Sequence, residues 1–319
     1  MLSIGIDLGG TNIKSALIHH QKGLLAKNSV PTDADQGPEH VLDRIAEAVQ
    51  IVGNEASEKP LGVGIGSPGI ISLDRTTVSN PPNLPGWNVI DVNKELKRRT
   101  GLHAIVENDA NLMALGSSRY GAGQSLDNLI MLTLGTGVGG GIIINRELYR
   151  GVSGGAAELG HVIINFDGPA SNSNAIGGIE AYIGQRFLVR NAIPLIKKHP
   201  GNRLAVDFLD QPETLEPVHL SQEADRGNEL AIEILSEAGR MLGYAIVNYI
   251  HILDIRNIIV SGGVAKAGDW ILEPARKAAR ERLIPPYLDG FQIVYETLGN
   301  DAALLGAGSL AFEHLANHR

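Results

Sequence analysis

The pair Asn108–Asp109 is the clearest candidate for acid–base chemistry, because it ends a short apolar segment at residues 103–107. A carboxylate at the end of a strand can take the proton of an attacking hydroxyl group, which is the role of the base in phosphoryl transfer to an alcohol. The Asn108 amide can hydrogen-bond neighbouring hydroxyls of the same acceptor. The pair equally suits the cap of a helix that begins at Ala110. The two interpretations are compatible.

Two glycine-rich turns indicate a second kind of chemistry, the binding of phosphate. Backbone N–H groups in such turns can approach a phosphate closely because glycine has no Cβ. A carboxylate beside one turn suits hydrated Mg²⁺, which binds through few carboxylates and keeps its waters. Either turn alone is also typical of an ordinary hairpin, but the two together favour phosphate binding. The residues concerned are Asp7, Gly9, Gly10 and Thr11 in the first turn and Gly135, Thr136 and Gly137 in the second.

Two familiar nucleotide-binding motifs are excluded by their context. Residues 64–69 and 135–140 both match G-x-G-x-x-G, but strand-like residues 70–72 and 142–144 follow them. The dinucleotide-binding motif requires a helix at that point. No G-x-x-x-x-G-K-[ST] sequence occurs either, so a P-loop is not expected.

Glu158, His161 and Glu180 form a third candidate group. Two carboxylates and an imidazole could hydrogen-bond the hydroxyl groups of a sugar. From spacing alone, a surface loop with scattered polar residues is the slightly better explanation.

Apolar segments and glycine turns predict a chain in which strands and helices alternate. Residues 2–8 and 12–19 read as strands around the first turn, and Pro38 stands near the start of a helical pattern. Residues 229–250 have the longest helical pattern, and a strand at 255–260 follows them. Residues 7–11 and 133–137 are similar in sequence, which indicates a degenerate repeat with one copy in each domain; chance similarity of two glycine turns is the alternative.

Composition limits the possible partners and compartments. The 319 residues are enough for two domains of about 150 residues each. The net charge is −8 and the basic residues are dispersed, which argues against a nucleic-acid or anionic-membrane partner. No run of about 18 apolar residues predicts a membrane span, and the first residues read as a strand and not as a leader. The chain has no cysteine, which excludes disulfides and thiolate metal sites and favours the cytoplasm.

Taken together, the motifs resemble those of the ROK family (repressors, open reading frames and kinases) in the actin/hexokinase/Hsp70 superfamily. The resemblance runs along the whole chain, and the order of the loops is most similar to that of bacterial glucokinases. The matching segments are 6–11 for the first phosphate motif, 64–69, 80–87 and 107–111 for the sugar loops, 134–141 for the second phosphate motif and 261–263 for the adenosine motif.

The resemblance implies an α/β fold of two RNase-H-like, actin-like ATPase domains with a cleft between them. The smaller domain would comprise residues 1–111 and a C-terminal helix at 305–319, and the larger one residues 112–304. Asp109 would be the general base. The sugar would contact Asn83, Asn108, Asp109, Glu158, His161 and Glu180. ATP and Mg²⁺ would bind at Asp7, Gly9, Gly10, Thr11, Lys14, Gly135, Thr136, Gly137, Gly262 and Gly263, with Asp7 reaching the metal through water.

The chain departs from the family pattern at one place. The family normally has three cysteines after its Glu-x-Gly-His motif, and these bind a structural zinc together with the histidine. Ser171, Ser173 and Gly178 stand at those positions here, whereas His161 and Glu180 are retained. Two hydroxyls and one imidazole do not make a tetrahedral zinc site, so no structural zinc is expected. Hydrogen bonds from neighbouring loop groups would then have to orient His161.

The expected function is ATP-dependent phosphorylation of the 6-hydroxyl of glucose by a cytoplasmic homodimer. Mannose, fructose or an N-acylhexosamine such as N-acetylmannosamine or N-acetylglucosamine are alternative acceptors, and polyphosphate is an alternative donor. A catalytically silent sugar-binding protein also stays open, because the cysteines are missing. A DNA-binding repressor of the family needs a helix-turn-helix domain before the first phosphate motif. That motif is already reached at residues 6–7 here, so a repressor is not expected.

Overall fold

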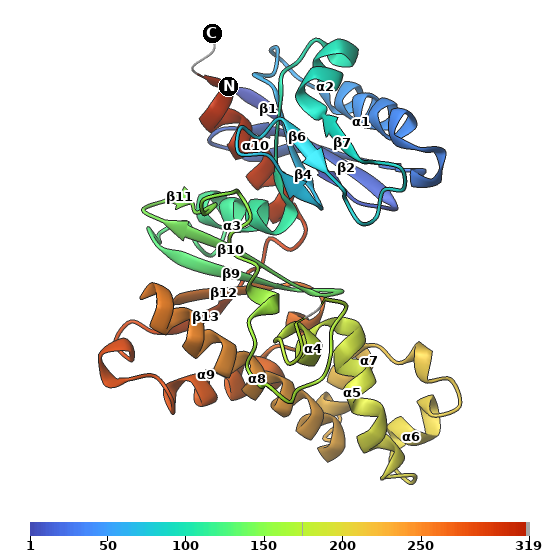
Figure 1. The fold of residues 1–319 in the computed structure, drawn as a ribbon, viewed down its shortest axis with the longest axis vertical. Coiled ribbons are helices and arrows are strands. Elements are labelled where there is room, and N and C mark those ends of the chain that lie inside the picture. Colours follow the sequence, from blue (N-terminus) through green and yellow to red (C-terminus); the bar gives the residue numbers. More distant parts are fainter. Residues whose placement is uncertain (174, 317–319) are drawn as a thin grey trace. The chain divides into compact units, whose positions relative to one another are not determined.

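A computed structural model describes residues 1–173 and 175–316 (Figure 1). The chain divides into two compact units, which are described one at a time. The first unit consists of residues 1–127, 141–157 and 298–319, and the second of residues 128–140 and 158–297. Within the described ranges, no helix has the length and apolar character needed to cross a membrane.

The first unit is built on a five-stranded mixed sheet in the order β3-β2-β1-β4-β8. Strands β1 (Leu2–Leu8), β2 (Asn12–His19) and β3 (Gly23–Pro31) are antiparallel neighbours. Strands β4 (Val63–Ser67) and β8 (Ala104–Asn108) continue the sheet in parallel with β1. The carboxyl ends of β1, β4 and β8 therefore lie at the same edge, where their loops can form a site.

Two pairs of helices cover the two faces of this sheet. Helices α1 (Pro38–Gly53) and α2 (Val92–Thr100) share one hydrophobic core with β1, β4 and β8. Helices α3 (Asp109–Tyr120) and α10 (Asp301–Leu315) pack on the opposite face, against side chains of β2 and β8. The 3₁₀ turn η1 (Ala34–Gln36) precedes α1.

Short strands complete the first unit. Strands β5 (Ile70–Ile71), β6 (Thr77–Ser79) and β7 (Val89–Asp91) form a small antiparallel sheet. Strand β10 (Val138–Ile144) ends in this unit and pairs with β11 (Glu147–Leu148) in an antiparallel hairpin.

The second unit contains three parallel strands together with a group of helices. Strand β12 (Asn257–Ser261) pairs with β9 (Leu129–Leu134) on one side and with β13 (Gln292–Tyr295) on the other. The helices are α4 (Glu180–Ile183), α5 (Gln185–Lys197), α6 (Arg203–Phe208), α7 (Pro217–Asp225), α8 (Glu229–Leu253) and α9 (Asp269–Arg280). The 3₁₀ turns are η2 (Leu159–His161), η3 (Pro212–Thr214), η4 (Val264–Ala267) and η5 (Pro285–Tyr287).

The predicted α/β class is confirmed, and most predicted elements occur within a few residues of their expected positions. The domain limits remain a prediction. The first compact unit includes α3, which packs closely against α10, and residues 141–157. Of the predicted C-terminal helix at 305–319, residues 317–319 lie outside the described residues.

The contact between α3 and α10 depends on glycines. A Cβ on Gly116 would lie 1.9 Å from the carbonyl oxygen of Ala302, and one on Gly306 would lie 1.9 Å from that of Leu112. The two helix backbones therefore approach each other at a distance that no larger residue permits at these positions. This contact fixes α3, whose first turn carries Asp109.

We expect Gly306→Ala to lower the free energy of unfolding by about 1–3 kcal/mol, since the methyl group must push two helix backbones apart. Gly201→Ala is the matched control, because an added Cβ at residue 201 meets no atom within 4 Å. The control should stay within about 0.5 kcal/mol of the parent in a denaturant titration. Equal stability of the two variants would show that the helices can separate without cost.

Candidate functional site

The first glycine turn is held at the end of β1 by its own backbone. The N–H of Gly9 donates to the carbonyl of Asn12 at 3.1 Å, and the Thr32 hydroxyl donates to the carbonyl of Gly9 at 2.7 Å. Asp7 lies directly opposite Lys14 on β2, with Nζ 3.5 Å from Oδ2. A partly exposed carboxylate beside a fixed turn is suited to holding Mg²⁺ through water, as the sequence predicts.

The predicted sugar residue Asn83 lies beside this turn. A Cβ on Gly10 would lie 2.8 Å from the Cβ of Asn83 and 3.1 Å from its carbonyl oxygen. Gly10 is therefore required by close packing against the 80–87 loop, in addition to any role at a phosphate. The structure brings together two motifs that are more than 70 residues apart in sequence.

Asn108 and Asp109 form the start of α3. The Asn108 side-chain oxygen accepts hydrogen bonds from the N–H groups of Ala110 at 3.0 Å and Asn111 at 3.3 Å. The cap predicted from sequence is thus present, while the Asp109 side chain is exposed. In the sheet, Asp7 pairs with Gly66 and Ser67 pairs with Asn108, so Asp7 and Asp109 belong to the same edge.

Glu107 is a fully buried carboxylate at the start of the 107–111 motif, and the sequence alone assigned it no role of its own. Its Oε1 accepts hydrogen bonds from the Asn108 backbone N–H at 2.9 Å and from Asn111 Nδ2 at 3.1 Å. Its Oε2 lies 3.0 Å from Nε of Arg75 and 2.7 Å from Nε of Arg150. Glu107 thereby fixes the backbone immediately before the proposed base.

The two arginines connect Glu107 to the neighbouring loops. Arg75 makes an aligned hydrogen bond to Glu107, whereas Arg150 makes an ion pair at short distance without hydrogen-bond alignment. Arg150 also donates to the backbone carbonyls of Leu73 and Ser72 at 2.8 and 3.0 Å. Burial, and secondarily the positive charge of Arg75, lower the pKa of Arg150, while Glu107 opposes that shift.

The second glycine turn is closed by Glu180 of α4. The N–H of Gly135 donates to the carbonyl of Gly137 at 2.9 Å, and the N–H of Val138 donates to Glu180 Oε2 at 3.1 Å. A Cβ on Gly137 would lie 2.2 Å from that oxygen. Glu180, predicted as a sugar residue, therefore also supports the predicted phosphate turn.

Gly262 lies beside this turn at the end of β12. Its φ is +100°, and a Cβ there would lie 2.3 Å from the carbonyl oxygen of Leu134. Ser261 pairs with Thr133, so the adenosine motif and the second phosphate motif follow neighbouring parallel strands. Gly263 has open space around it and is exposed.

Glu158 and His161 lie on the turn η2 of the second unit. Their side chains are 70% and 40% exposed, and Oε2 of Glu158 is 3.7 Å from Nε2 of His161. Hydrogen bonds join this turn to the segment before α4, since the N–H of Ile179 donates to the carbonyl of Val162 at 3.1 Å. The structure thus places Glu158, His161 and Glu180 on adjoining segments.

The residues at the zinc positions do not fit a zinc ion. Ser171 and Ser173 are hydrogen-bonded to each other at 3.0 Å, and Gly178 offers no donor atom. A Cβ on Gly178 would lie 3.4 Å from the carbonyl oxygen of His161, so its backbone packs directly against the η2 turn. Among residues 1–173 and 175–316, no cluster of three or more His, Cys, Asp or Glu side chains could hold a metal.

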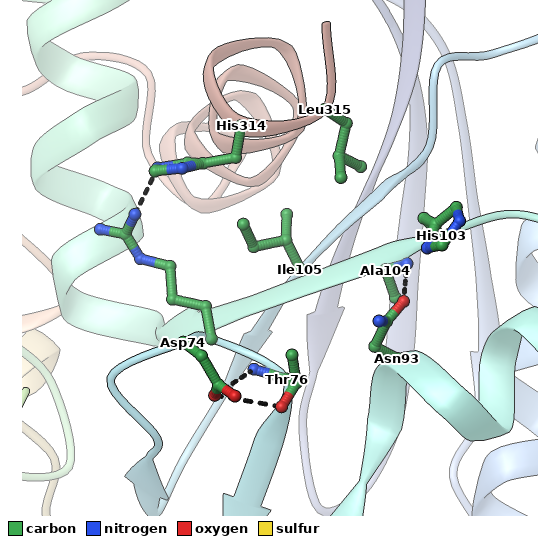
Figure 2. A pocket seen from close by; sticks show the side chains of 9 residues that line it. Asp74, Thr76, Asn93, His103, Ala104, Ile105, His314 and Leu315 are labelled. Carbon is green, nitrogen blue, oxygen red and sulfur yellow. Dashed lines mark hydrogen bonds between the residues drawn. The ribbon is translucent and has the colours of Figure 1, made fainter. Parts of the chain in front are cut away.

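A cavity of about 590 Å³ in the first unit is lined by Arg75 and His314, among other residues (Figure 2). Arg75 and His314 contact each other at its wall. Burial, and secondarily the charge of Arg75, lower the pKa of His314. Its lining contains none of the predicted site residues, so this cavity does not define the sugar or nucleotide site.

Comparison with solved structures shows the fold class of this chain. The chain superposes on a ROK family glucokinase from Streptomyces griseus in complex with glucose and AMPPNP, with a TM-score of 0.82, 35% identity, and 98% and 100% of the two chains covered. It superposes on a ROK hexokinase from Thermus thermophilus with a TM-score of 0.84 at 30% identity, over 99% and 100% of the chains. These are sugar kinases of the actin-like ATPase fold, and the present chain has that fold.

The family follows from the sequence match. The profile described as "ROK family" matches residues 3–314. A glucokinase from Thermotoga maritima is 35% identical over 312 residues, which is 98% of each chain. The chain belongs to the ROK family, as the resemblance of its motifs indicated.

We expect Glu107→Ala to lower the free energy of unfolding by about 3–5 kcal/mol, because two arginines lose a buried counter-charge. Glu313→Ala is the matched control. It removes an ion pair to Arg119 in which Glu313 is 37% exposed, and such pairs contribute about 0–1 kcal/mol. Chemical denaturation of both variants measures the difference, and a loss at Glu107 no larger than that at Glu313 would contradict the role assigned to the buried carboxylate.

Proposed function

We propose that this protein is an ATP-dependent glucose kinase that transfers the γ-phosphoryl group of ATP to the 6-hydroxyl of glucose. One observation carries the proposal: the exposed carboxylate of Asp109 lies at the sheet edge that also carries the Asp7 turn. A base and a phosphate-binding turn on one edge are what phosphoryl transfer to an alcohol requires. The choice of glucose is supported by the glucokinases to which the chain is similar.

In the first unit, Asp109 would accept the proton of the 6-hydroxyl as its oxygen attacks the γ-phosphorus. The O–P bond to glucose forms while the bond from the γ-phosphorus to the bridging oxygen breaks, so that glucose 6-phosphate and ADP result. Asn108 and Asn83 would hydrogen-bond other hydroxyls and orient the sugar. Because Glu107 and the α3 cap hold the Asn108 backbone, little reorganisation is needed at the base.

In the second unit, Glu158, His161 and Glu180 would hydrogen-bond the sugar through their exposed or partly exposed polar atoms. The turn at Gly135, Thr136 and Gly137 would donate backbone N–H groups to the ATP phosphates, and Gly262 and Gly263 would flank the nucleoside. Catalysis then consists largely of positioning and of neutralising phosphate charge.

Mg²⁺ would be held by Asp7 through water, with Gly9, Gly10, Thr11 and Lys14 at the phosphates on the same turn. When bound, the metal supplies positive charge that stabilises the leaving phosphate. The single carboxylate of Asp7 suits a magnesium ion that keeps most of its waters.

The proposal extends to a cytoplasmic homodimer that acts in glycolysis. The absence of cysteine supports the compartment. Light scattering of the purified protein tests the dimer. Other hexoses, N-acylhexosamines and polyphosphate as donor are outcomes that a substrate panel would reveal.

We expect Asp109→Asn to reduce kcat by about 10²–10⁴-fold while glucose still binds, because the amide keeps the shape but cannot accept the proton. A coupled assay for ADP measures turnover, and calorimetry measures glucose binding. The control is Asp269→Asn, which changes another exposed aspartate at the first position of a helix, α9, and should leave turnover unchanged. Near-normal turnover of Asp109→Asn would refute the assignment of the base.

We also expect the active protein to contain far less than one zinc per chain, because Ser171, Ser173 and Gly178 do not complete a zinc site. Elemental analysis of protein with measured kinase activity tests this expectation. Stoichiometric zinc in that sample would show that other ligands replace the cysteines.

A further inference from the structure

The η2 turn combines a buried backbone with exposed functional side chains. Leu159 and Gly160 are buried, whereas the side chains of Glu158 and His161 are exposed. The orientation of these two side chains toward a sugar therefore depends on what fixes the backbone between them. In the family that the motifs resemble, a zinc ion holds this turn and is bound by the histidine at this position and by three cysteines. This chain lacks the three cysteines.

A tyrosine hydroxyl from the core of the second unit reaches this backbone. Tyr249 of α8 is 2% exposed, and its Oη donates to the carbonyl oxygen of Leu159 at 2.6 Å. The same carbonyl accepts the N–H of Val162 at 3.3 Å, so both of its lone pairs are used. Burial raises the pKa of Tyr249.

Packing restricts the rest of the turn but does not replace this bond. A Cβ on Gly160 would lie 2.1 Å from the carbonyl oxygen of Val138, so the turn lies directly against the start of β10. The hydrogen bond from Ile179 to Val162 holds the far side of the turn. Tyr249 adds to these backbone contacts a side-chain hydrogen bond that ties the turn to the long helix α8.

We propose that Tyr249 is a positioning residue for sugar binding, and that its hydrogen bond to Leu159 holds Glu158 and His161 in the arrangement that zinc maintains in the family pattern. The expected change in the KM for glucose rests on the proposed function. The restraint of the η2 backbone does not rest on it, because the bond restricts that backbone whatever ligand binds there.

The test is Tyr249→Phe, which removes one oxygen atom and keeps the buried ring. We expect the KM for glucose to rise roughly three- to tenfold, the factor that one hydrogen bond commonly contributes. The KM for ATP and kcat should change by less than about twofold, since the bond is made to Leu159 and touches neither the phosphate turns nor Asp109. Amide hydrogen exchange in the 158–162 segment should accelerate by a similar factor.

The matched control is Tyr120→Phe, which removes a hydroxyl that donates to the carbonyl of His20 in the first unit. It should alter neither the KM for glucose nor exchange in the 158–162 segment. An unchanged glucose KM in Tyr249→Phe, equal rises in the KM values for glucose and ATP, or the same change in both variants would overturn the inference. If the parent protein does not phosphorylate glucose, the proposed function fails, and the exchange measurement alone decides whether Tyr249 holds the turn.

Discussion

The carboxylate of Glu107 is buried with two guanidinium groups, and the first half of the candidate site depends on this interaction. An uncompensated charge in that position would be costly, so Arg75 and Arg150 must both reach it from separate loops. The same carboxylate binds the Asn108 N–H, which begins the turn that presents Asp109. A charged group that touches no proposed substrate atom thereby positions the residue proposed as the base.

The second half of the candidate site is held by hydrogen bonds and close packing. Glu180 binds the N–H of Val138 and so connects the predicted sugar loop to the phosphate turn. Gly178 packs on His161 where the family pattern has a zinc-binding cysteine, and Tyr249 supports the turn from the core. Loss of the metal ligands is therefore accompanied by contacts that can keep the loop ordered.

The sequence was sufficient to predict the α/β class, the glycine turns and most strands, because apolar periodicity and glycine spacing are local signals. It also predicted a cap formed by the Asn108–Asp109 pair; the cap is Asn108, and the helix begins at Asp109 and not at Ala110. It could not reveal Glu107 or Tyr249, since their importance comes from partners more than 30 residues away in the chain. The short strands β5 to β7 were likewise missed as a sheet, because segments of two or three residues carry almost no periodic signal.

The most direct test of the central claim is ³¹P nuclear magnetic resonance of a reaction that contains the protein, ATP, Mg²⁺ and glucose. We expect ADP and glucose 6-phosphate in equal amounts, with inorganic phosphate far below both. A phosphorylated hydroxyl other than the 6-hydroxyl, or ATP that remains intact with folded protein and glucose present, would contradict it.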